Sequence, residues 1–453
     1  MKQTIAILCL IGASLSGFSQ DKSFDLSKYK FPDYKRHELE LNFNSSGYNM
    51  GSSWNQIPTS QNNNADKTGW SAANSQSNLG LSYSYNKIDR KSIDYLYSSL
   101  SGNYAYSMQD NYLQKEKQFK PEINWNFGGT RDYYLTENKF FVEGFLNSGL
   151  SFKKTKITID NNVNQNDNDN SFNAAIGLGV GYGRKEKVSD LWQAYYILEN
   201  LKKQNSLVRE LKENDIFEFA NFTSKLKNKR FFDFRLRKIA ELQALDSLLQ
   251  KQGLIKDSDI LYFTTLNDYW NFCDFPDRLS GRIFKFWLSP EYWSSRNMSL
   301  NNSTINNNST YLKSNISFEC DKQLNLFWER IVKLYLSNVT LLDQTDENIT
   351  NHPKNLLFTS LEMSYGYYPN TRTGLHASVG YAGKEVTTSS YQSPGLPSKF
   401  WNNEINMGLN GVYYISQHLQ LYGNFNLTHG FEAYQNGNHE RFDYNLGLRY
   451  AIF

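Results

Sequence analysis

The chain is 453 residues long and nearly balanced in charge, with 48 basic and 45 acidic residues. This balance leaves no electrostatic reason to expect a nucleic acid as a partner. The three cysteines are too few for a disulfide scaffold. The 31 Tyr and 30 Phe stand out, and an aromatic-rich composition favours β-structure.

The first residues predict export from the cytoplasm. Lys2 supplies a positive charge, an apolar run extends from Ile5 to Ile11, and the segment "SGFSQ" offers a small-residue cleavage site before Gln20. We therefore interpret 1–19 as a signal peptide that the mature protein lacks. No later run reaches the roughly 18 to 20 apolar residues that a transmembrane helix needs.

Apolar and polar residues begin to alternate at about residue 36. Leu39, Leu41 and Phe43 are separated by Glu40 and Asn42, and similar runs recur up to the middle of the chain. An alternation with a period of two gives a β-strand one apolar and one polar face. The sequence therefore predicts a series of strands in its first half.

Alternating glycines at 177, 179, 181 and 183 mark the end of this series. A phosphate-binding loop would need Gly-Lys-Ser/Thr, whereas Gly183 is followed by Arg184 and Lys185. A dinucleotide fingerprint would need a two-residue gap between glycines, which is missing too. The glycines are instead predicted to form one face of the sixth strand, where they allow a backbone or a bulky side chain to approach closely. No cofactor is expected.

The hydrophobic period changes to 3.6 residues between 185 and 280. Ser189 or Asp190 is a candidate cap for a first helix, and "ENDIFEFANF" predicts the start of a second. The clearest helix, "RFFDFRLRKIAELQALDSLLQKQG", stops at Gly253, and "DSDILYFTTLNDYWNF" predicts a fourth. These signals predict a helical insertion.

Alternation with a period of two returns after the insertion and brings the total to about 14 strands. The connections between strands form two classes that alternate along the chain. Short connections are "KIDRKS", "TRDYYLTE", "CDKQ", "PNTRT" and "SQH". Long polar connections are 45–74, 109–119, 157–170, 295–309, 342–354, 384–398 and 434–440. A soluble β-sandwich has no reason to sort its loops by length in this way.

The chain ends in "YNLGLRYAIF", which alternates from Tyr444 to Ile452 and has Phe453 as its last residue. This ending resembles the terminal strand of bacterial outer-membrane proteins. With the even strand number and the sorted loops, the whole mature chain resembles a Gram-negative outer-membrane β-barrel.

This resemblance implies a mainly β fold, namely a transmembrane antiparallel β-barrel of about 14 strands in the lipid of the outer membrane. The two halves of the barrel would be 36–184 and 281–453. An even strand number puts both chain ends on the periplasmic side. The N-terminal segment 20–35 and the helical insertion 185–280 are therefore expected there.

Charged residues on the polar face of the strands are candidates for lining the lumen. Such charges either pair across the lumen or select the solute that passes. The candidates are Glu122, Glu143, Lys285, Lys313, Glu362, His376, Glu404 and Arg449. The polar segment "DNNVNQNDNDN" lacks the Gly and Glu of a calcium loop, so no metal site is expected.

Two cysteines remain after removal of the signal peptide. Cys273 ends the insertion, and Cys320 lies at the base of the eighth predicted strand. Both are expected near the periplasmic rim, where the compartment is oxidising. A disulfide that fixes the insertion to the barrel is therefore a hypothesis, and two separate thiols are its alternative.

These features predict a porin-like channel, or a transport or export component, for hydrophilic solutes. Region 188–272 would dock a periplasmic protein or polymer or gate the pore, unless it is a bundle that only caps the barrel. A second possibility is a non-conducting barrel for surface assembly or anchoring, with a plugged lumen. A third is a barrel-embedded hydrolase, but none of the histidines stands in a nucleophile motif. We assign no catalytic residue and do not expect an enzyme.

Overall fold

The computed structural model describes residues 26–55, 67–110, 114–135, 139–160, 162–228, 234–255, 259–272, 278–299, 304–346, 353–388, 399–416, 419–432 and 437–450. These residues form one antiparallel sheet of 14 strands, in which each strand pairs with its neighbours in chain order. The mainly β fold with its helical insertion is therefore confirmed.

The strands differ in length, and the longest lie in the first half of the chain. Their bounds are β1 (Tyr34–Asn55), β2 (Lys67–Ile88), β3 (Ser92–Asp110), β4 (Lys115–Tyr134), β5 (Phe140–Ile159), β6 (Asn162–Lys187), β7 (Leu279–Met298), β8 (Thr304–Gln323), β9 (Trp328–Asp346), β10 (Pro353–Asn370), β11 (Thr373–Thr388), β12 (Lys399–Tyr414), β13 (Leu419–Glu432) and β14 (Gly437–Tyr450). All exceed the 9 to 11 residues or so that a tilted strand needs to span a bilayer.

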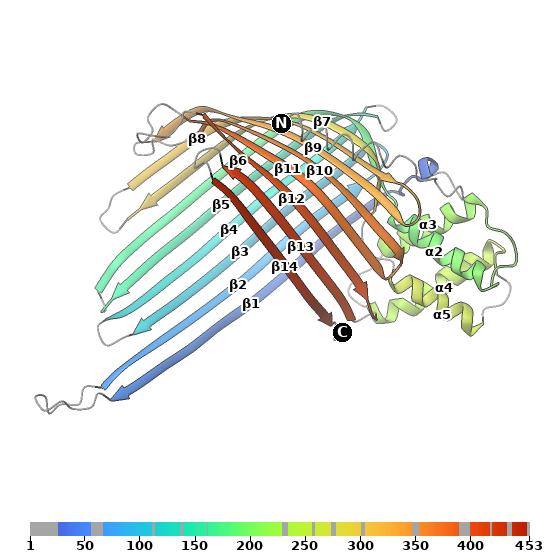
Figure 1. Cartoon of the computed structure of the whole chain (residues 1–453), viewed down its shortest axis with the longest axis horizontal. Coiled ribbons are helices and arrows are strands. Elements are labelled where there is room, and N and C mark those ends of the chain that lie inside the picture. The colour runs from blue at the N-terminus through green and yellow to red at the C-terminus, as the bar shows by residue number, and fades with distance from the viewer. Residues whose placement is uncertain are drawn as a thin grey trace, which may run out of the picture.

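The sheet is strongly curved and carries the helices at one end (Figure 1). β6 ends there and β7 begins there, and since neighbouring strands run in opposite directions, β1 also begins there and β14 ends there. We call this end the helix-side mouth. Among the described residues the pairing does not return from β14 to β1, so the expected closure of the barrel is not seen along these two edges.

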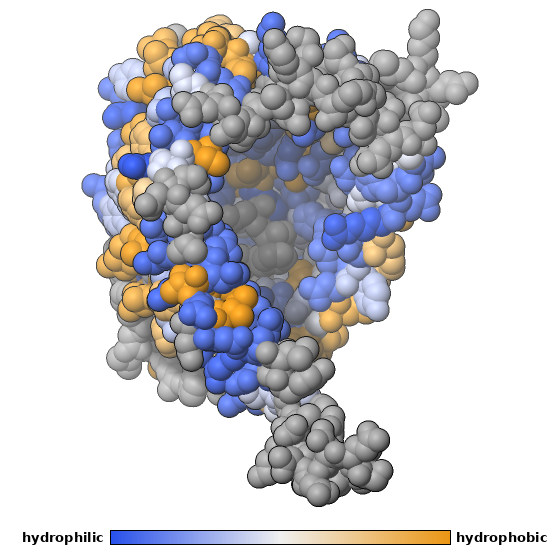
Figure 2. Space-filling model, turned by 90° about the vertical axis from the view of Figure 1, so that its left-hand side faces the viewer, coloured by the Kyte–Doolittle hydropathy of each residue, from blue (hydrophilic) through white to orange (hydrophobic). Residues whose placement is uncertain are grey.

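Large apolar side chains cover one face of the sheet and stay exposed along its whole width. Leu41 is 69% exposed, Leu178 is 71% exposed and Leu446 is 63% exposed. In the view from the end opposite the helices, hydrophobic residues lie on the outer flank and mostly hydrophilic residues border the hollow (Figure 2). None of the described residues outside the sheet covers this face, and on strands this long such a face fits an apolar medium.

Several segments that were expected to be long polar loops are strands. β5 continues to Ile159 and β6 starts at Asn162, so most of 157–170 belongs to a tight hairpin. Asp160 turns this hairpin with a φ of 47°. β1 and β2 extend into 45–74 in the same way. The loop predictions were wrong because ladder hydrogen bonds come from the backbone, which polar side chains leave intact.

Two short connections also lie further along the chain than expected. β4 continues to Tyr134, so "TRDYYLTE" is mostly strand, and β8 continues to Gln323, so "CDKQ" is strand as well. β5 then begins at Phe140, and the turn after β8 follows at 324–327. In both cases charged residues continue the polar face of a strand instead of marking its end.

Within the described residues the insertion forms α2 (Ser189–Lys203), α3 (Glu213–Asn228), α4 (Phe234–Lys251) and α5 (Ile260–Phe272). We call these four helices the helical module. They bury a shared core that includes Leu198, Phe219, Leu245, Tyr262 and Trp270. None of the described helices is long and apolar enough to cross a membrane.

The helix ends follow the sequence signals in part. Gly253 ends α4 with a φ of 63°, as expected for a glycine stop. The expected cap of α2 is wrong, because Val188 occupies that position without a side-chain hydrogen bond. Ser189 instead accepts the backbone N–H of Arg278 at 2.8 Å, and Asp190 binds Lys227 at 2.8 Å. Both side chains are used for tertiary contacts.

The module is fastened to the sheet at its base and by the N-terminal segment. At the base, the N–H of Val188 donates to the carbonyl of Arg278 at 2.8 Å and extends the pairing of β6 with β7. The N-terminal segment includes the short helix η1 (Leu26–Lys28), followed by the buried Tyr29 and Phe31. Tyr29 belongs to the core of the module. The predicted signal peptide lies outside the described residues.

Candidate functional site: the concave face and the helix-side mouth

The cross-strand register places all eight lumen candidates, each a described residue, on the face opposite the exposed apolar residues. This face is concave, since Lys285 on β7 reaches Asp132 on β4 across the two intervening strands. Only a face that curves inward brings side chains of such distant strands together.

The structure brings two of the eight candidates into direct contact. Lys285 Nζ lies 2.9 Å from Glu143 Oε2 and 3.0 Å from Asp132 Oδ2. It also lies 5.3 Å from the centre of the buried Phe141 ring, within the range of a cation–π contact. The two carboxylate side chains are each 9% exposed. We call Lys285, Asp132, Glu143 and Phe141 the Lys285 cluster; its two carboxylates on the concave face are almost completely shielded from water.

The other candidates find different partners. Lys313 pairs with Glu291, which was not among the eight, and Glu362 lies 3.8 Å from Lys333. Glu122 accepts a hydrogen bond from Asn124 at 2.8 Å.

Three candidates on the second half of the sheet make no contact with one another. His376 shares a hydrogen bond of 2.9 Å with the hydroxyl of Tyr368. Glu404 borders a cavity of about 540 Å³. The Arg449 guanidinium stands 6.0 Å from the ring of Tyr422. The candidates are therefore spread along the concave face and do not form one site.

A second, deeper group lies at the helix-side mouth around Arg278, the residue just before β7. Its side chain is 4% exposed and stands between two aromatic rings, 4.7 Å from that of Trp192 and 4.5 Å from that of Tyr368. Its guanidinium donates to Glu329 at 3.4 Å and to Gln323 at 2.5 Å. Burial lowers the pKa of Arg278, although an arginine stays protonated at physiological pH.

This Arg278 network joins the helical module to the sheet. Trp192 comes from α2, while Gln323, Glu329 and Tyr368 come from β8, β9 and β10. Tyr196 of α2 adds a hydrogen bond from its hydroxyl to the carbonyl of Tyr368 at 3.1 Å. The first helix of the module is thus seated against the mouth of the sheet by buried polar contacts.

Two further ion-pair groups also lie at the mouth. Lys185 contacts Glu319 and Asp321, and its Nζ lies 3.2 Å from Asp321 Oδ2. Arg90, in the turn between β2 and β3, contacts Glu186 at 2.8 Å and donates to the carbonyl of Phe31. The second group holds the N-terminal segment against the end of β6.

The cysteine hypothesis remains a prediction. Cys320 is half-buried at the end of β8, on the same face as the exposed apolar residues. Cys273 lies outside the described residues. The described residues contain no cluster of three or more His, Cys, Asp or Glu arranged to hold a metal ion.

Fold and site together define a barrel-like antiparallel sheet with an apolar outer face, a polar concave face and a helical module on one mouth. No protein-family model matches the chain, and no curated protein matches it either.

Solved structures match over most of the chain at low similarity. The toluene transporter TodX of Pseudomonas putida has 7% identity and a TM-score of 0.27, with 92% of this chain and 89% of that chain covered. A loop-deletion mutant of OmpT, an outer membrane protein of Vibrio cholerae, has 8% identity and a TM-score of 0.26, with coverages of 91% and 99%. The translocator domain of the autotransporter NalP from Neisseria meningitidis has 8% identity and a TM-score of 0.21, with coverages of 100% and 98%. The likeness is too loose to assign a substrate or an activity.

Proposed function

We propose that this chain is an outer-membrane β-barrel that acts as a channel or transport component for hydrophilic solutes. The observation that carries the proposal is the division of the sheet into an exposed apolar face and a charged concave face. The apolar face requires a lipid environment, because water would leave its large side chains unfavourably exposed. The concave face supplies the fixed charges that a polar pathway uses to select its solute.

Charges on β9 and β10 of the concave face are well placed to meet a solute. The side chains of Lys333 and Glu362 are 48% and 46% exposed. They are therefore accessible to water and to a passing ion, whereas the carboxylates of the Lys285 cluster are nearly closed off.

Conductance of the full-length protein in planar bilayers tests the proposal. We expect ion currents, and we expect Glu362→Gln to lower the preference for cations because it removes a fixed negative charge. Lys154→Gln, which alters an exposed lysine on the outer face of β5, is the matched control and should leave the preference unchanged.

A second candidate function is a non-conducting barrel for anchoring or surface assembly. It is favoured by the seating of α2, whose Trp192 and Tyr196 are buried at the mouth. Full-length protein that inserts into bilayers without any current, also after Arg278→Ala, would support this reading over the channel. Release of product from a panel of ester or lipid substrates would instead support a hydrolase.

We also propose that region 188–272 docks a periplasmic protein or polymer. Ile260 is 82% exposed and Leu261 is 52% exposed at the start of α5, and these side chains offer an apolar contact on the module. A photo-crosslinking residue at 260 should capture an envelope component, while the same residue at the exposed position of Glu210 should not. Equal labelling from both positions would argue against docking at α5.

A further inference from the structure

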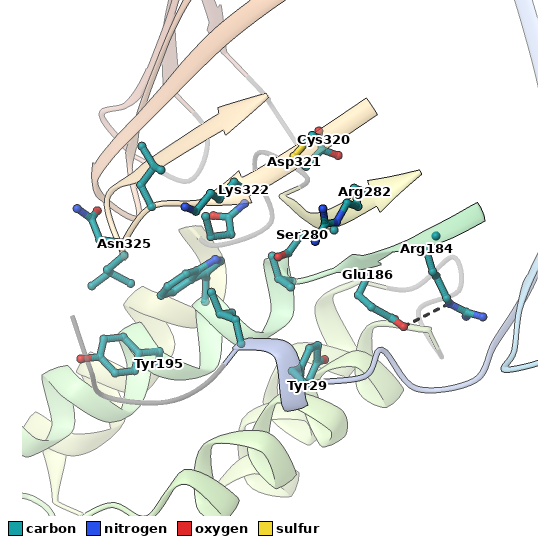
Figure 3. A pocket seen from close by; sticks show the side chains of 18 of the residues that line it. Tyr29, Arg184, Glu186, Tyr195, Ser280, Arg282, Cys320, Asp321, Lys322 and Asn325 are labelled. Atoms are coloured by element: carbon teal, nitrogen blue, oxygen red, sulfur yellow. Dashed lines mark ion pairs between the residues drawn. The ribbon is translucent and has the colours of Figure 1, made fainter. Parts of the chain in front are cut away.

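A cavity of about 700 Å³ lies where the ends of the strands meet the helical module. In the close view it is bordered by β6, β7 and β8 on one side and by α2 and η1 on the other (Figure 3). We call it the rim cavity. The apolar part of its wall comes from Leu26, Tyr29, Trp192, Tyr195 and Leu326.

Part of the charge that lines the rim cavity is already neutralised. Arg184 lies 3.3 Å from Glu186, the ion pair drawn in Figure 3. Asp321 lies 3.2 Å from Lys185 and is almost fully buried. Both carboxylates of the cavity lining, Glu186 and Asp321, therefore have a cation partner.

Three further cations of the lining have no carboxylate partner. Lys139, Arg282 and Lys322 are exposed, and in the part of the chain that the structure describes none of them makes an ion pair. They come from the turn before β5, from β7 and from β8. The rim cavity is therefore positively charged and matches an anion.

The position of these cations coincides with the end of the apolar outer face. Phe140, Tyr182 and Phe284 lie side by side on β5, β6 and β7 and are 57%, 44% and 44% exposed. Arg282 lies two residues before Phe284 on the same face, and Lys139 directly precedes Phe140. Exposed aromatic rings followed by cations are typical of the boundary between lipid tails and headgroups.

We propose that the rim cavity binds the anionic phosphodiester headgroup of a phospholipid from the helix-side leaflet. Arg282, Lys322 and Lys139 would contact the phosphate, while the acyl chains would lie along Tyr182 and Phe284 on the outer face. The inference rests on the membrane insertion in the proposed function, but not on conductance. A bound lipid would thereby bridge the sheet and the helical module.

Native mass spectrometry of the full-length protein in detergent tests this site with two added lipids. Phosphatidylglycerol should bind in preference to zwitterionic phosphatidylcholine. The double variant Arg282→Gln/Lys322→Gln should bind phosphatidylglycerol about tenfold more weakly, since each basic residue near an anionic headgroup adds to its binding. The conservative double variant Arg282→Lys/Lys322→Arg should keep the binding.

The control removes the same charge elsewhere. Lys154→Gln/Lys156→Gln alters two exposed lysines of β5 toward the opposite end of the sheet and should bind phosphatidylglycerol like the unaltered chain. Equal binding of both lipids, or equal losses in the two glutamine double variants, would overturn the site. Displacement by glycerol phosphate in the same concentration range would also overturn it, because a soluble phosphate would then suffice. A non-conducting protein with an intact lipid preference would overturn the channel alone.

Discussion

The concave face carries ion pairs both around Arg278 at the helix-side mouth and further along β9 and β10, and the two regions differ in burial. The Arg278 and Glu329 side chains at the mouth are 4% and 3% exposed, whereas those of Lys333 and Glu362 are 48% and 46% exposed. A buried pair is costly to break because one charge stays behind without water, whereas an exposed pair adds little stability. The buried pair therefore helps to hold the module, whereas the exposed pair is accessible to water.

The largest effect is expected from Arg278→Ala at the mouth. It would leave Glu329 buried without its cation and remove the stacking between Trp192 and Tyr368. We expect a loss of about 3 to 5 kcal/mol in the free energy of unfolding. Urea unfolding in detergent micelles, followed by tryptophan fluorescence, measures this loss of free energy. Proteolysis of the helical module should also become faster.

Arg372→Ala provides the matched control for this comparison. Arg372 also links the sheet to the module, through Asp268 of α5 at 2.6 Å, but the two side chains are 35% and 40% exposed. We expect a loss of less than about 1 kcal/mol. Equal losses for the two arginines would contradict the role given to burial.

A smaller effect is expected from Lys285→Met in the Lys285 cluster. The substitution leaves Asp132 and Glu143 without their cation, but the lysine is 22% exposed, so water compensates in part. We expect a loss of about 2 kcal/mol and a stronger preference for cations in the bilayer measurement. An unchanged ion preference would show that solutes do not sense this cluster.

Gly181 on the inward face of β6 allows a test of packing, with Gly144 on the outward face of β5 as its comparison. A Cβ at Gly181 would lie 2.0 Å from the ring of Phe141, whereas one at Gly144 would meet nothing within 4 Å. Gly181→Ala should therefore cost about 1 to 3 kcal/mol and Gly144→Ala much less. Thermal unfolding of both variants in the same detergent checks this, and similar melting temperatures would exclude close packing at Gly181.

Another small effect concerns the module itself and depends on pH. Arg209 holds Asp215 with hydrogen bonds of 2.7 and 2.9 Å, and these lower the pKa of the carboxyl, as does the backbone N–H of Lys212. Because the folded pKa lies below the unfolded value, this stability is present at neutral pH and is lost as the pH falls through the folded pKa.

Asp215→Asn should therefore cost about 1 kcal/mol at pH 7 and nearly nothing at strongly acidic pH. Helical circular dichroism during unfolding at both pH values measures the difference. A variant that is destabilised equally at both pH values would show that the charge of Asp215 has no part in the effect.

Alternation along the chain was sufficient to predict the strands and the face on which each candidate charge lies. The register follows from the side-chain period of two, so Glu143 and Lys285 could both be assigned to the polar face from the sequence alone. Their contact could not be predicted, because it depends on how strongly the strands between them curve.

The residues that sequence reasoning missed lie where strands end. Asp132 stands in a segment that was read as a turn, although it continues the even-numbered polar positions of Glu122 and Asn124. Arg278 precedes its strand and Glu329 is the second residue of its strand, so neither has enough neighbours to show a pattern. Polar residues at strand ends look alike whether they face solvent or a buried network.

The short contact between Val188 and Arg278 has a consequence for the order in which the chain folds. Helices form from near neighbours and therefore early, whereas distant segments meet late. Once the helical module has formed, its base holds the end of β6 beside the start of β7, as a two-residue turn does in a hairpin. The helical module would then hold the two central strands together, so that strand pairing in both halves of the sheet proceeds outward from the centre of the chain.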